Sequence, residues 1–181
     1  LVRGEGAYLA LCNRYETLTR APGGQGYLCN WQWTSDLHAP KVVPSLGRWL
    51  MARALRDHPI RRSKSPRHSA TDPEISFIIG HRGREREPLL LATIESIAAQ
   101  KGAAVECIVV EQDSNPRLAG RLPDWVRLVH TPPTPETPYN RSLAFNEGAA
   151  NARGRILVLH DNDMMVPADY AREILDRAAQ G

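Results

Sequence analysis

The chain has 181 residues, of which 42% are hydrophobic and 24% are charged, a composition typical of a soluble globular protein with one ordinary domain and an appendage. This composition excludes an intrinsically disordered chain, a collagen and a disulfide scaffold. Twenty-three Lys and Arg residues against 20 Asp and Glu residues give a net charge of +3, so the charge does not favour a nucleic acid as the partner.

The cysteines and the start of the chain bear on its cellular location. Cys12, Cys29 and Cys107 are odd in number and form no CxxC pair, which indicates a reducing compartment, so we expect a cytoplasmic protein. No apolar run is long enough to span a membrane, and peripheral association with the cytoplasmic face of a membrane stays open. The first residues contain neither an initiator Met nor a signal peptide, and we therefore expect a fragment of a longer protein.

Residues 1–60 are expected to form an N-terminal segment of uncertain fold. A Gly-rich stretch at residues 23–26 and an aromatic run at residues 27–33 are interpreted either as a turn and a strand or as a broken piece of another domain. The glycines precede neither a helix pattern nor a Lys-Ser/Thr pair, which disfavours a phosphate-binding loop. Residues 44–58 place apolar side chains at helical spacing behind a proline, which predicts one amphipathic helix.

Residues 61–73 read RRSKSPRHSATDP, and this charged, Ser- and Pro-containing stretch predicts a linker. From residue 74 the pattern becomes regular. Apolar runs at residues 75–79 and 105–110 flank a helical apolar stripe at residues 87–101, which predicts a β-α-β unit. Because both runs are continuously apolar, we expect them at the centre of a parallel sheet that is covered on both faces.

The remaining elements continue the same alternation of strands and helices. We expect strands at residues 126–129 and 156–159, a Pro-rich loop at 131–138, a helix at 141–152 and a last helix that opens near Pro167. The sequence therefore predicts an α/β fold over residues 74–181, with a mostly parallel sheet flanked by helices.

Polar side chains follow three of the predicted strands. In open α/β sheets, ligands bind beyond the carboxyl ends of the strands, so these residues are the first candidates for a site. The three stretches are Gly80-His81-Arg82-Gly83-Arg84-Glu85, Glu111-Gln112-Asp113-Ser114 and His160-Asp161-Asn162-Asp163.

Asp161 and Asp163 directly follow a strand of buried character, where two carboxylates can bind one divalent cation. The competing interpretation is a solvated turn that caps the next helix. His81 and His160 have no partner at metal-ligand spacing, so we favour packing or supporting roles over ligation or proton transfer for both. No GxSxG elbow or Cys-His pairing supports covalent hydrolase chemistry.

Arginines and a tyrosine offer contacts to a nucleotide. Arg82 and Arg84 can bind a phosphate or a carboxylate, and the alternative is a solvated loop in which Arg84 and Arg86 pair with the glutamates next to them. Tyr139 and Arg141 precede a predicted helix and together suit a base and its phosphate, although packing alone would also explain the tyrosine.

Taken in order, these segments resemble the nucleotide-sugar-binding half of a GT-A glycosyltransferase, of family 2 in the broad sense. The motifs are closest to those of the family 7 galactosyltransferases, which have a Pro-Phe-Arg-x-Arg-Glu motif, then Phe-Asn-Arg with a later Asn-x-Gly, then Asp-x-Asp before a hydrophobic pair and Pro. The corresponding segments here are Gly80-His81-Arg82-Gly83-Arg84-Glu85, Tyr139-Asn140-Arg141 with Asn146 and Gly148, and Asp161-Asn162-Asp163-Met164-Met165-Val166-Pro167. The resemblance covers residues 74–170.

The resemblance implies a function and a set of site residues. It implies binding of a nucleotide-sugar, with UDP as the favoured nucleotide, and inverting transfer of the sugar to a hydroxyl of a glycan or other acceptor. A Mn²⁺ or Mg²⁺ ion bound by Asp163, with Asp161 beside the ribose and the metal, would neutralise the departing diphosphate. The implied nucleotide contacts are Gly80 and His81, which replace the family's Pro and Phe, and Arg82, Arg84, Glu111, Asp113, Tyr139, Arg141 and Asp161.

The acceptor-side segment and the general base of the resembled family are expected beyond Gly181. Two other function classes therefore stay open. One is a nucleotide-binding or assembly fragment without catalysis. The other is a nucleotidyltransferase, which the lack of a Gly-rich, Lys-containing loop after the first strand disfavours. The donor sugar, the acceptor and the oligomeric state do not follow from the sequence.

Overall fold

The computed structural model describes residues 14–23, 27–33, 43–66, 71–134 and 139–180. The chain divides into two compact units, residues 1–57 together with residue 181, and residues 58–180. Residues 24–26 of the Gly-rich stretch, the side chain of Cys29, and Cys12 lie outside the described part. Parts of the predicted linker (67–70) and of the Pro-rich loop (135–138) also lie outside it.

The first unit contains two strands and one helix. Strands β1 (Arg14–Arg20) and β2 (Tyr27–Trp33) pair antiparallel, with Arg14 opposite Trp33 and Arg20 opposite Tyr27. Helix α3 (Pro44–Asp57) confirms the predicted amphipathic helix and starts at the proline, whose fixed φ suits the first helical position. Strand β1 was not predicted from the sequence.

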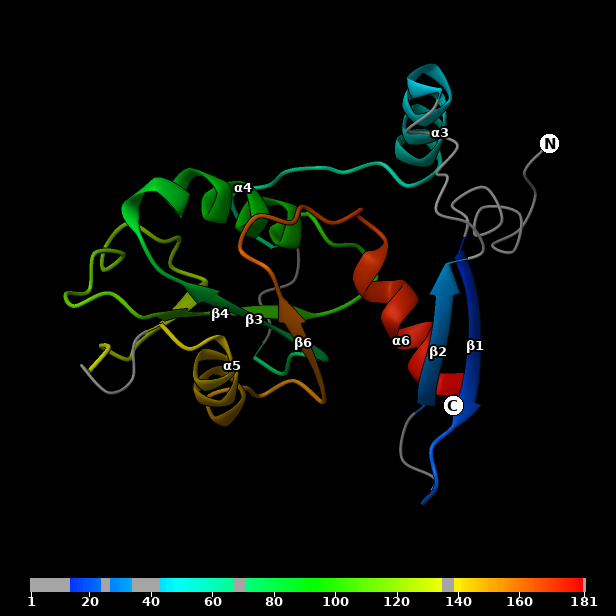
Figure 1. Ribbon diagram of the computed structural model, residues 1–181. Helices are drawn as coiled ribbons and strands as arrows, with labels where there is room; N and C mark the ends of the chain where they lie inside the picture. Colours follow the sequence, from blue (N-terminus) through cyan, green and yellow to red (C-terminus); the bar gives the residue numbers. More distant parts are fainter. Residues whose placement is uncertain (1–13, 24–26, 34–42, 67–70, 135–138, 181) are drawn as a thin grey trace. The chain divides into compact units, whose positions relative to one another are not determined.

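The second unit is built on a four-stranded parallel sheet with the order β5-β4-β3-β6. Its strands are β3 (Ile75–His81), β4 (Val105–Glu111), β5 (Val126–His130) and β6 (Ile156–His160). A 3-10 turn η1 (Arg84–Arg86) leads into α4 (Glu87–Ala98), and α5 (Arg141–Ala150) and α6 (Tyr170–Gln180) follow later in the chain. The predicted α/β fold with a parallel sheet flanked by helices is confirmed (Figure 1).

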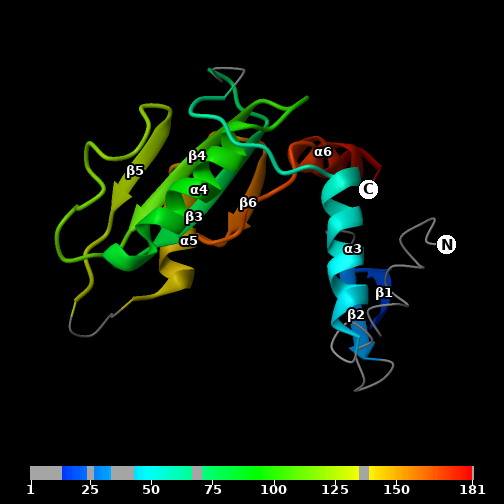
Figure 2. The same cartoon turned by 90° about the horizontal axis from the view of Figure 1, so that it is seen from above.

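Helices cover both faces of this sheet (Figures 1 and 2). Alternate side chains of β3 point to opposite faces. Ile75, Phe77 and Ile79 pack in the larger core with residues of α4 and α6, whereas Ile78 faces α5. A Cβ atom on Gly148 of α5 would lie 2.2 Å from Ile78 Cγ2, so α5 packs this closely only because a glycine stands there.

The two central strands are buried as predicted. Every residue of β4 is buried, and in β3 Gly80 alone is partly exposed. Strand β6 pairs with β3 and lies at the edge of the described sheet, with Leu157 44% exposed and Leu159 55% exposed. Its apolar run resembles a central strand in sequence but faces solvent on one side.

The described residues of the predicted linker belong to the second unit and contact its other elements. The Ser63 amide donates to the Glu95 carbonyl at 2.9 Å, and the Trp125 indole donates to the Lys64 carbonyl at 3.1 Å. Arg62 also forms an ion pair with Glu95 at 2.5 Å. The two compact units divide between residues 57 and 58, and the proposed boundaries of 1–60, 61–73 and 74–181 stay a prediction.

A buried carboxylate joins the amino ends of three strands. Glu106 of β4 accepts hydrogen bonds from the Ser76 hydroxyl at 2.7 Å and from the Arg153 amide at 2.6 Å, and the Gly154 amide donates to both Ser76 Oγ and Glu106. Burial raises the pKa of Glu106, but hydrogen bonds from Ser76 and Arg153 outweigh it, and the net pKa lies below the usual range. The ionised carboxylate thus fixes the turn that leads into β6.

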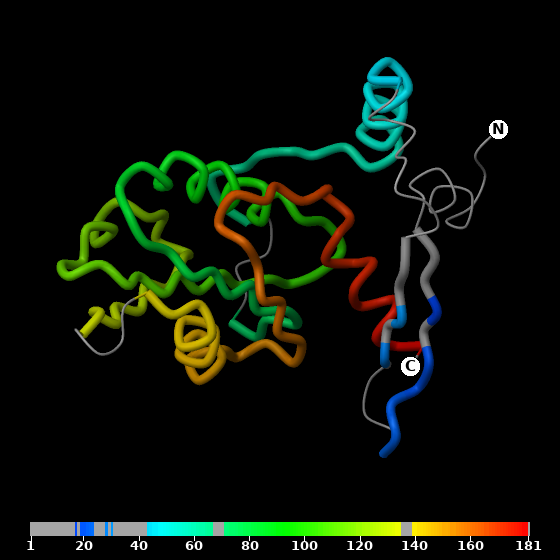
Figure 3. The backbone as a smooth tube through the Cα atoms, viewed as in Figure 1, coloured from blue at the N-terminus to red at the C-terminus, as the bar shows by residue number. Residues whose placement is uncertain are grey.

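Figure 3 traces the path of the chain from β5 at one edge of this sheet, through α5, to β6 at the opposite edge. This crossing brings the loops after β3 and β6 next to each other, because these two strands are neighbours in the sheet.

Candidate functional site

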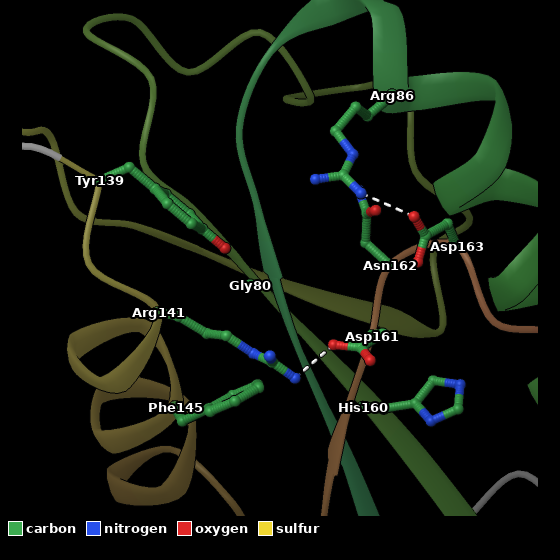
Figure 4. A pocket seen from close by; sticks show the side chains of 9 residues that line it. All are labelled: Gly80, Arg86, Tyr139, Arg141, Phe145, His160, Asp161, Asn162 and Asp163. Carbon is green, nitrogen blue, oxygen red and sulfur yellow. Dashed lines mark hydrogen bonds and ion pairs between the residues drawn. The ribbon is translucent and has the colours of Figure 1, made fainter. Parts of the chain in front are cut away.

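A cavity of about 290 Å³ lies at the carboxyl ends of β3 and β6. The chain leaves β3 toward β4 on one side and returns to β6 on the other, so this is the point where the strand order reverses, where open α/β sheets bind ligands. Figure 4 shows the nine lining residues, which are Gly80, Arg86, Tyr139, Arg141, Phe145, His160, Asp161, Asn162 and Asp163.

Asp161 and Asp163 lie in the loop after β6, and each forms an ion pair with an arginine. Asp163 Oδ2 lies 2.6 Å from Arg86 Nη2, and Asp161 Oδ1 contacts Arg141 Nη2 (Figure 4). The side chain of Asp163 is 38% exposed and that of Asp161 is 49% exposed. The cavity therefore holds two solvent-accessible carboxylates, each balanced by a guanidinium group.

Asn162, between the two aspartates, turns away from solvent and anchors their loop. Its side-chain amide donates to His81 Nδ1 at 2.9 Å, and its carbonyl accepts from the Thr93 hydroxyl at 3.1 Å. Burial lowers the pKa of His81, outweighing the opposite effect of nearby carboxylates such as Asp113. An unprotonated Nδ1 is what the Asn162 amide requires, so His81 supports the loop from within the protein and does not line the cavity.

His160 has a similar supporting arrangement, although it lines the cavity. It is 6% exposed, its Nε2 lies 2.8 Å from the Met164 carbonyl, and its ring meets the Phe77 ring edge-on at 5.6 Å. Burial lowers the pKa of His160, and the hydrogen bond to Met164 and the nearby Asp161 only partly offset this. With Nε2 donating to the carbonyl, His160 holds the end of the loop that contains both aspartates.

The first turn of α5 forms the opposite wall of the cavity. Asn140 caps this helix, because its side chain accepts from the Leu143 amide at 3.0 Å. Arg141 extends from that turn across the Phe145 ring, 5.1 Å from its centroid. A Cβ atom on Gly80 would lie 3.3 Å from the Tyr139 hydroxyl, so the missing side chain leaves room for Tyr139 over the end of β3.

Two predicted arginines lie outside the cavity lining. Arg82 in the loop after β3 and Arg84 at the start of η1 are exposed, and they flank Gly83, whose φ of 88° favours glycine. Arg86 pairs with Asp163 instead of with its neighbour Glu87, and Glu87 pairs with Arg121 at 2.5 Å. The alternative pairing of Arg86 with Glu87 is therefore wrong.

The acidic residues after β4 brace the loops and also lie outside the cavity lining. Glu111 is fully buried and accepts hydrogen bonds from the amides of Arg117 and Leu118, at 2.9 and 3.2 Å. Asp113 accepts from the Gly83 amide at 3.1 Å, and its carbonyl accepts from His130. In this structure both residues fix the shape of the loops beside the cavity.

Three lining residues, Arg86, Phe145 and Asn162, were given no role in the site by sequence reasoning. Asn162 lies between the two aspartates, and its position alone could have identified it as the anchor of that loop. Phe145 follows Arg141 by four residues, the spacing at which helical side chains meet. For Arg86, the sequence carries no signal that distinguishes it from Arg82 and Arg84.

The chemistry of the lining residues fits a divalent cation of the Mg²⁺ or Mn²⁺ type. Such ions take oxygen ligands and in phosphate-binding sites use one or two carboxylates, with phosphate oxygens and water in the other positions. Among the residues that the structure describes, no group of three or more His, Cys, Asp or Glu side chains is placed to hold a metal. Asp161 and Asp163 are the two carboxylate residues among those that line the cavity.

Comparison with known proteins matches residues 76–181 to "Glycosyl transferase family 2". The match covers more than half of the chain. The chain belongs to this family. Membership agrees with the resemblance seen in the order of the motifs, and it covers the sheet, the cavity and both aspartates.

This family 2 chain is similar to a curated protein, the succinoglycan biosynthesis protein ExoO of Rhizobium meliloti, with 32% identity over 112 residues. The alignment covers 59% of this chain and 30% of the relative, so the chain spans about a third of the length of that protein. A solved structure, the mannosyltransferase PcManGT from Pyrobaculum calidifontis in complex with GDP-Man and Mn²⁺, matches with 23% identity and a TM-score of 0.43. That match covers 78% of this chain and 40% of the other.

Within the described ranges, none of the helices of this family 2 chain has the length and apolar character needed to cross a bilayer.

Proposed function

We propose that this chain is the donor-binding part of a glycosyltransferase that binds a nucleotide-sugar together with a divalent cation and serves transfer of the sugar to a hydroxyl acceptor. The observation that supports it most is the cavity itself, at the reversal of strand order, with two exposed carboxylates and two guanidinium groups on its walls. Family membership gives the reaction class.

Each lining group has a task in this proposal. Asp161 and Asp163 hold the cation, and the resemblance of the motifs also assigns Asp161 a contact with the ribose. Arg141 binds an anionic oxygen of the nucleotide, and Tyr139 offers its ring to the base. When bound, the cation supplies Lewis-acid stabilisation of the diphosphate as it leaves the sugar.

The residues around the cavity orient those that line it. His81 and Asn162 fix the loop of the two aspartates, and Asp113 holds the Gly83 amide. Arg82 and Arg84 are exposed and lie outside the cavity lining, and their contact with a phosphate of the nucleotide comes from the resemblance of the motifs. Glu111 shapes the neighbouring loop through the two amides that it accepts from, and a direct contact to the base or ribose would require it to release them.

UDP as the nucleotide and inversion of configuration are the finer parts of the proposal, and both come from the resemblance of the motifs. A second candidate function is nucleotide binding without transfer. It is favoured by one observation: among the described residues that line the cavity, the carboxylates belong to Asp161 and Asp163, which the cation would engage. The general base of a complete enzyme would then come from residues outside this chain.

The cytoplasmic location and a peripheral association with a membrane stay predictions. Cys107, the free cysteine among the described side chains, is buried in the sheet, and burial raises the pKa of its thiol. A buried thiol of this kind is a packing residue, so it is compatible with the expected reducing compartment.

Calorimetric titration with UDP and with GDP, each with and without Mn²⁺, tests the proposal. We expect metal-dependent binding by the unchanged chain and a loss of at least about tenfold in that binding for Asp163→Ala, because one of two carboxylate ligands is removed. Asp124→Ala is the matched control, since Asp124 is an exposed aspartate before β5, at the other end of the sheet, and should change binding by less than about twofold.

Metal-dependent affinity that is the same in Asp163→Ala and in the unchanged chain would refute the proposed site. Release of the nucleotide diphosphate from a nucleotide-sugar, accompanied by a glycosylated acceptor, would favour transfer over the binding-only alternative.

A further inference from the structure

Arg86 lines the cavity and has no role in the function proposed so far. It is the last residue of η1, directly before α4, and its guanidinium group extends over the loop of the two aspartates (Figure 4). Its Nη2 lies 2.6 Å from Asp163 Oδ2, and the side chain is 50% exposed. The adjacent acid, Glu87, is buried and paired with Arg121, so Arg86 is directed toward the cavity.

The charges of the cavity balance one another without a ligand. Arg86 and Arg141 face Asp163 and Asp161, two positive groups against two negative ones. Each arginine contacts a carboxylate oxygen of the kind that a cation would use. A cation that enters alone must therefore displace a guanidinium group and leave it without an anionic partner, which opposes binding.

The charges add up differently for a cation that enters together with a diphosphate. The diphosphate brings more negative charge than the cation brings positive charge, and its oxygens suit the planar donors of a guanidinium group. An arginine displaced from its aspartate then gains a new anionic partner a short distance away. The same two arginines that oppose the free cation would favour the complex of cation and diphosphate.

Arg86 is better suited to this exchange than Arg141. Arg141 stacks over Phe145, and this contact keeps it on the α5 wall. Arg86 extends from a short 3-10 turn, and its side chain is half exposed, so its guanidinium group can move without disturbing the core.

We propose that Arg86 is a donor-binding residue that changes partners, from Asp163 in the empty site to the diphosphate of the bound nucleotide, and so makes cation and nucleotide bind cooperatively. This inference rests on the proposed function. By linkage, the factor by which UDP strengthens Mn²⁺ binding equals the factor by which Mn²⁺ strengthens UDP binding, so either measurement gives the coupling.

The experiment measures Mn²⁺ binding alone, by the paramagnetic resonance signal of the free ion, and UDP binding with and without Mn²⁺, by calorimetry. We expect Arg86→Gln to bind Mn²⁺ alone several-fold more tightly, because the guanidinium group that competes for Asp163 is gone. We expect it to bind UDP in the presence of Mn²⁺ about tenfold more weakly, because the same group no longer binds the diphosphate. Arg86→Lys keeps the charge without the planar donors, so its affinity for Mn²⁺ alone should stay near that of the unchanged chain.

Arg155→Gln is the matched control. Arg155 is an exposed arginine that directly precedes β6, at the amino end of the sheet, and its loss removes the same charge from the same unit. Its Mn²⁺ and UDP affinities should stay within about twofold of those of the unchanged chain.

The outcomes separate the two proposals. If the unchanged chain binds no UDP or GDP with Mn²⁺, the proposed function fails. If it does bind them but Arg86→Gln keeps the coupling factor, or Arg155→Gln lowers it equally, the inference about Arg86 fails and the proposed function stands. Thermal melting of each variant checks folding. If Arg86→Gln is unstable, Arg86→Lys tests the planar donors: weaker UDP binding with Mn²⁺ at an unchanged Mn²⁺ affinity supports the exchange of partners, and unchanged UDP binding contradicts it.

Discussion

The two ends of the parallel sheet each combine acidic side chains with arginines, and they do so in opposite ways. At the amino end, the side chain of Glu106 is 6% exposed and is bonded to a hydroxyl, two backbone amides and arginines. At the carboxyl end, Asp161 and Asp163 are 49% and 38% exposed and pair with half-exposed guanidinium groups. The comparison shows that a buried carboxylate with fixed donors holds the fold, whereas an exposed carboxylate with a movable partner is available to a ligand.

The largest effect is expected from breaking the amino end. Glu106→Ala leaves the Ser76 hydroxyl and the Arg153 amide without their acceptor and removes one of the two acceptors of the Gly154 amide. We expect the free energy of unfolding to fall by about 2–3 kcal/mol. Chemical denaturation measures it. Glu173→Ala is the control, since the Glu173 side chain on α6 is 45% exposed and its ion pair is 3.6 Å long, and the substitution should cost less than about 0.5 kcal/mol. Equal losses for both variants would show that the Glu106 cluster is no more than a surface ion pair.

Lowering the pH is expected to have a smaller effect on the free energy of unfolding. Burial lowers the pKa of His81 and of His160 in the folded chain, whereas both should titrate near 6.5 when unfolded. Below about pH 6.5 these two histidines bind protons in the unfolded chain but not yet in the folded chain. The free energy of unfolding should therefore fall as the pH drops from about 6.5 toward the lower folded pKa values. Denaturation curves at pH 8, 7, 6 and 5 (rough steps across this range) measure the slope.

His81→Asn sharpens this test. An asparagine can keep an oxygen acceptor for the Asn162 amide and cannot be protonated, so the variant should have a shallower loss of stability below pH 6.5 than the unchanged chain. An unchanged slope would show that His81 does not contribute to acid sensitivity.

The smallest effect on stability is expected at the carboxyl end. Asp163→Asn removes one charge of an exposed ion pair, so we expect the free energy of unfolding to change by less than about 0.5 kcal/mol. The same denaturation curves measure it beside Glu106→Ala. A loss of about 2 kcal/mol or more would mean that the Arg86 pair is part of the structural framework, and the contrast between the two ends would disappear.

The sequence predicted the sheet and the position of the aspartates because both depend on local patterns. Continuous apolar runs identified β3 and β4, and polar residues directly after β6 had to lie at the carboxyl edge once that strand was parallel to its neighbour. The direction of individual side chains was less predictable. Glu111 and Asp161 both follow apolar runs, yet Glu111 turns inward to the amides of its own loop, whereas Asp161 faces solvent.

Long-range partners were the other limit of sequence reasoning. The partner of Arg86 lies in the loop after β6, and nearby glutamates made a local pair look equally reasonable. The charge of Glu106 interrupts an apolar strand, and its donors come from β3 and from the turn before β6. Such contacts follow from the order of strands in the sheet, which periodicity in the sequence does not specify.

The neighbouring strands β3 and β6 are about 80 residues apart along the chain, a separation that slows folding because a long loop must close before the strands can pair. Until that closure, the arginines and the aspartates of the cavity belong to separate parts of the chain. Acquisition of nucleotide affinity during refolding would therefore mark the docking of β6, and a fluorescent nucleotide would report this step in real time.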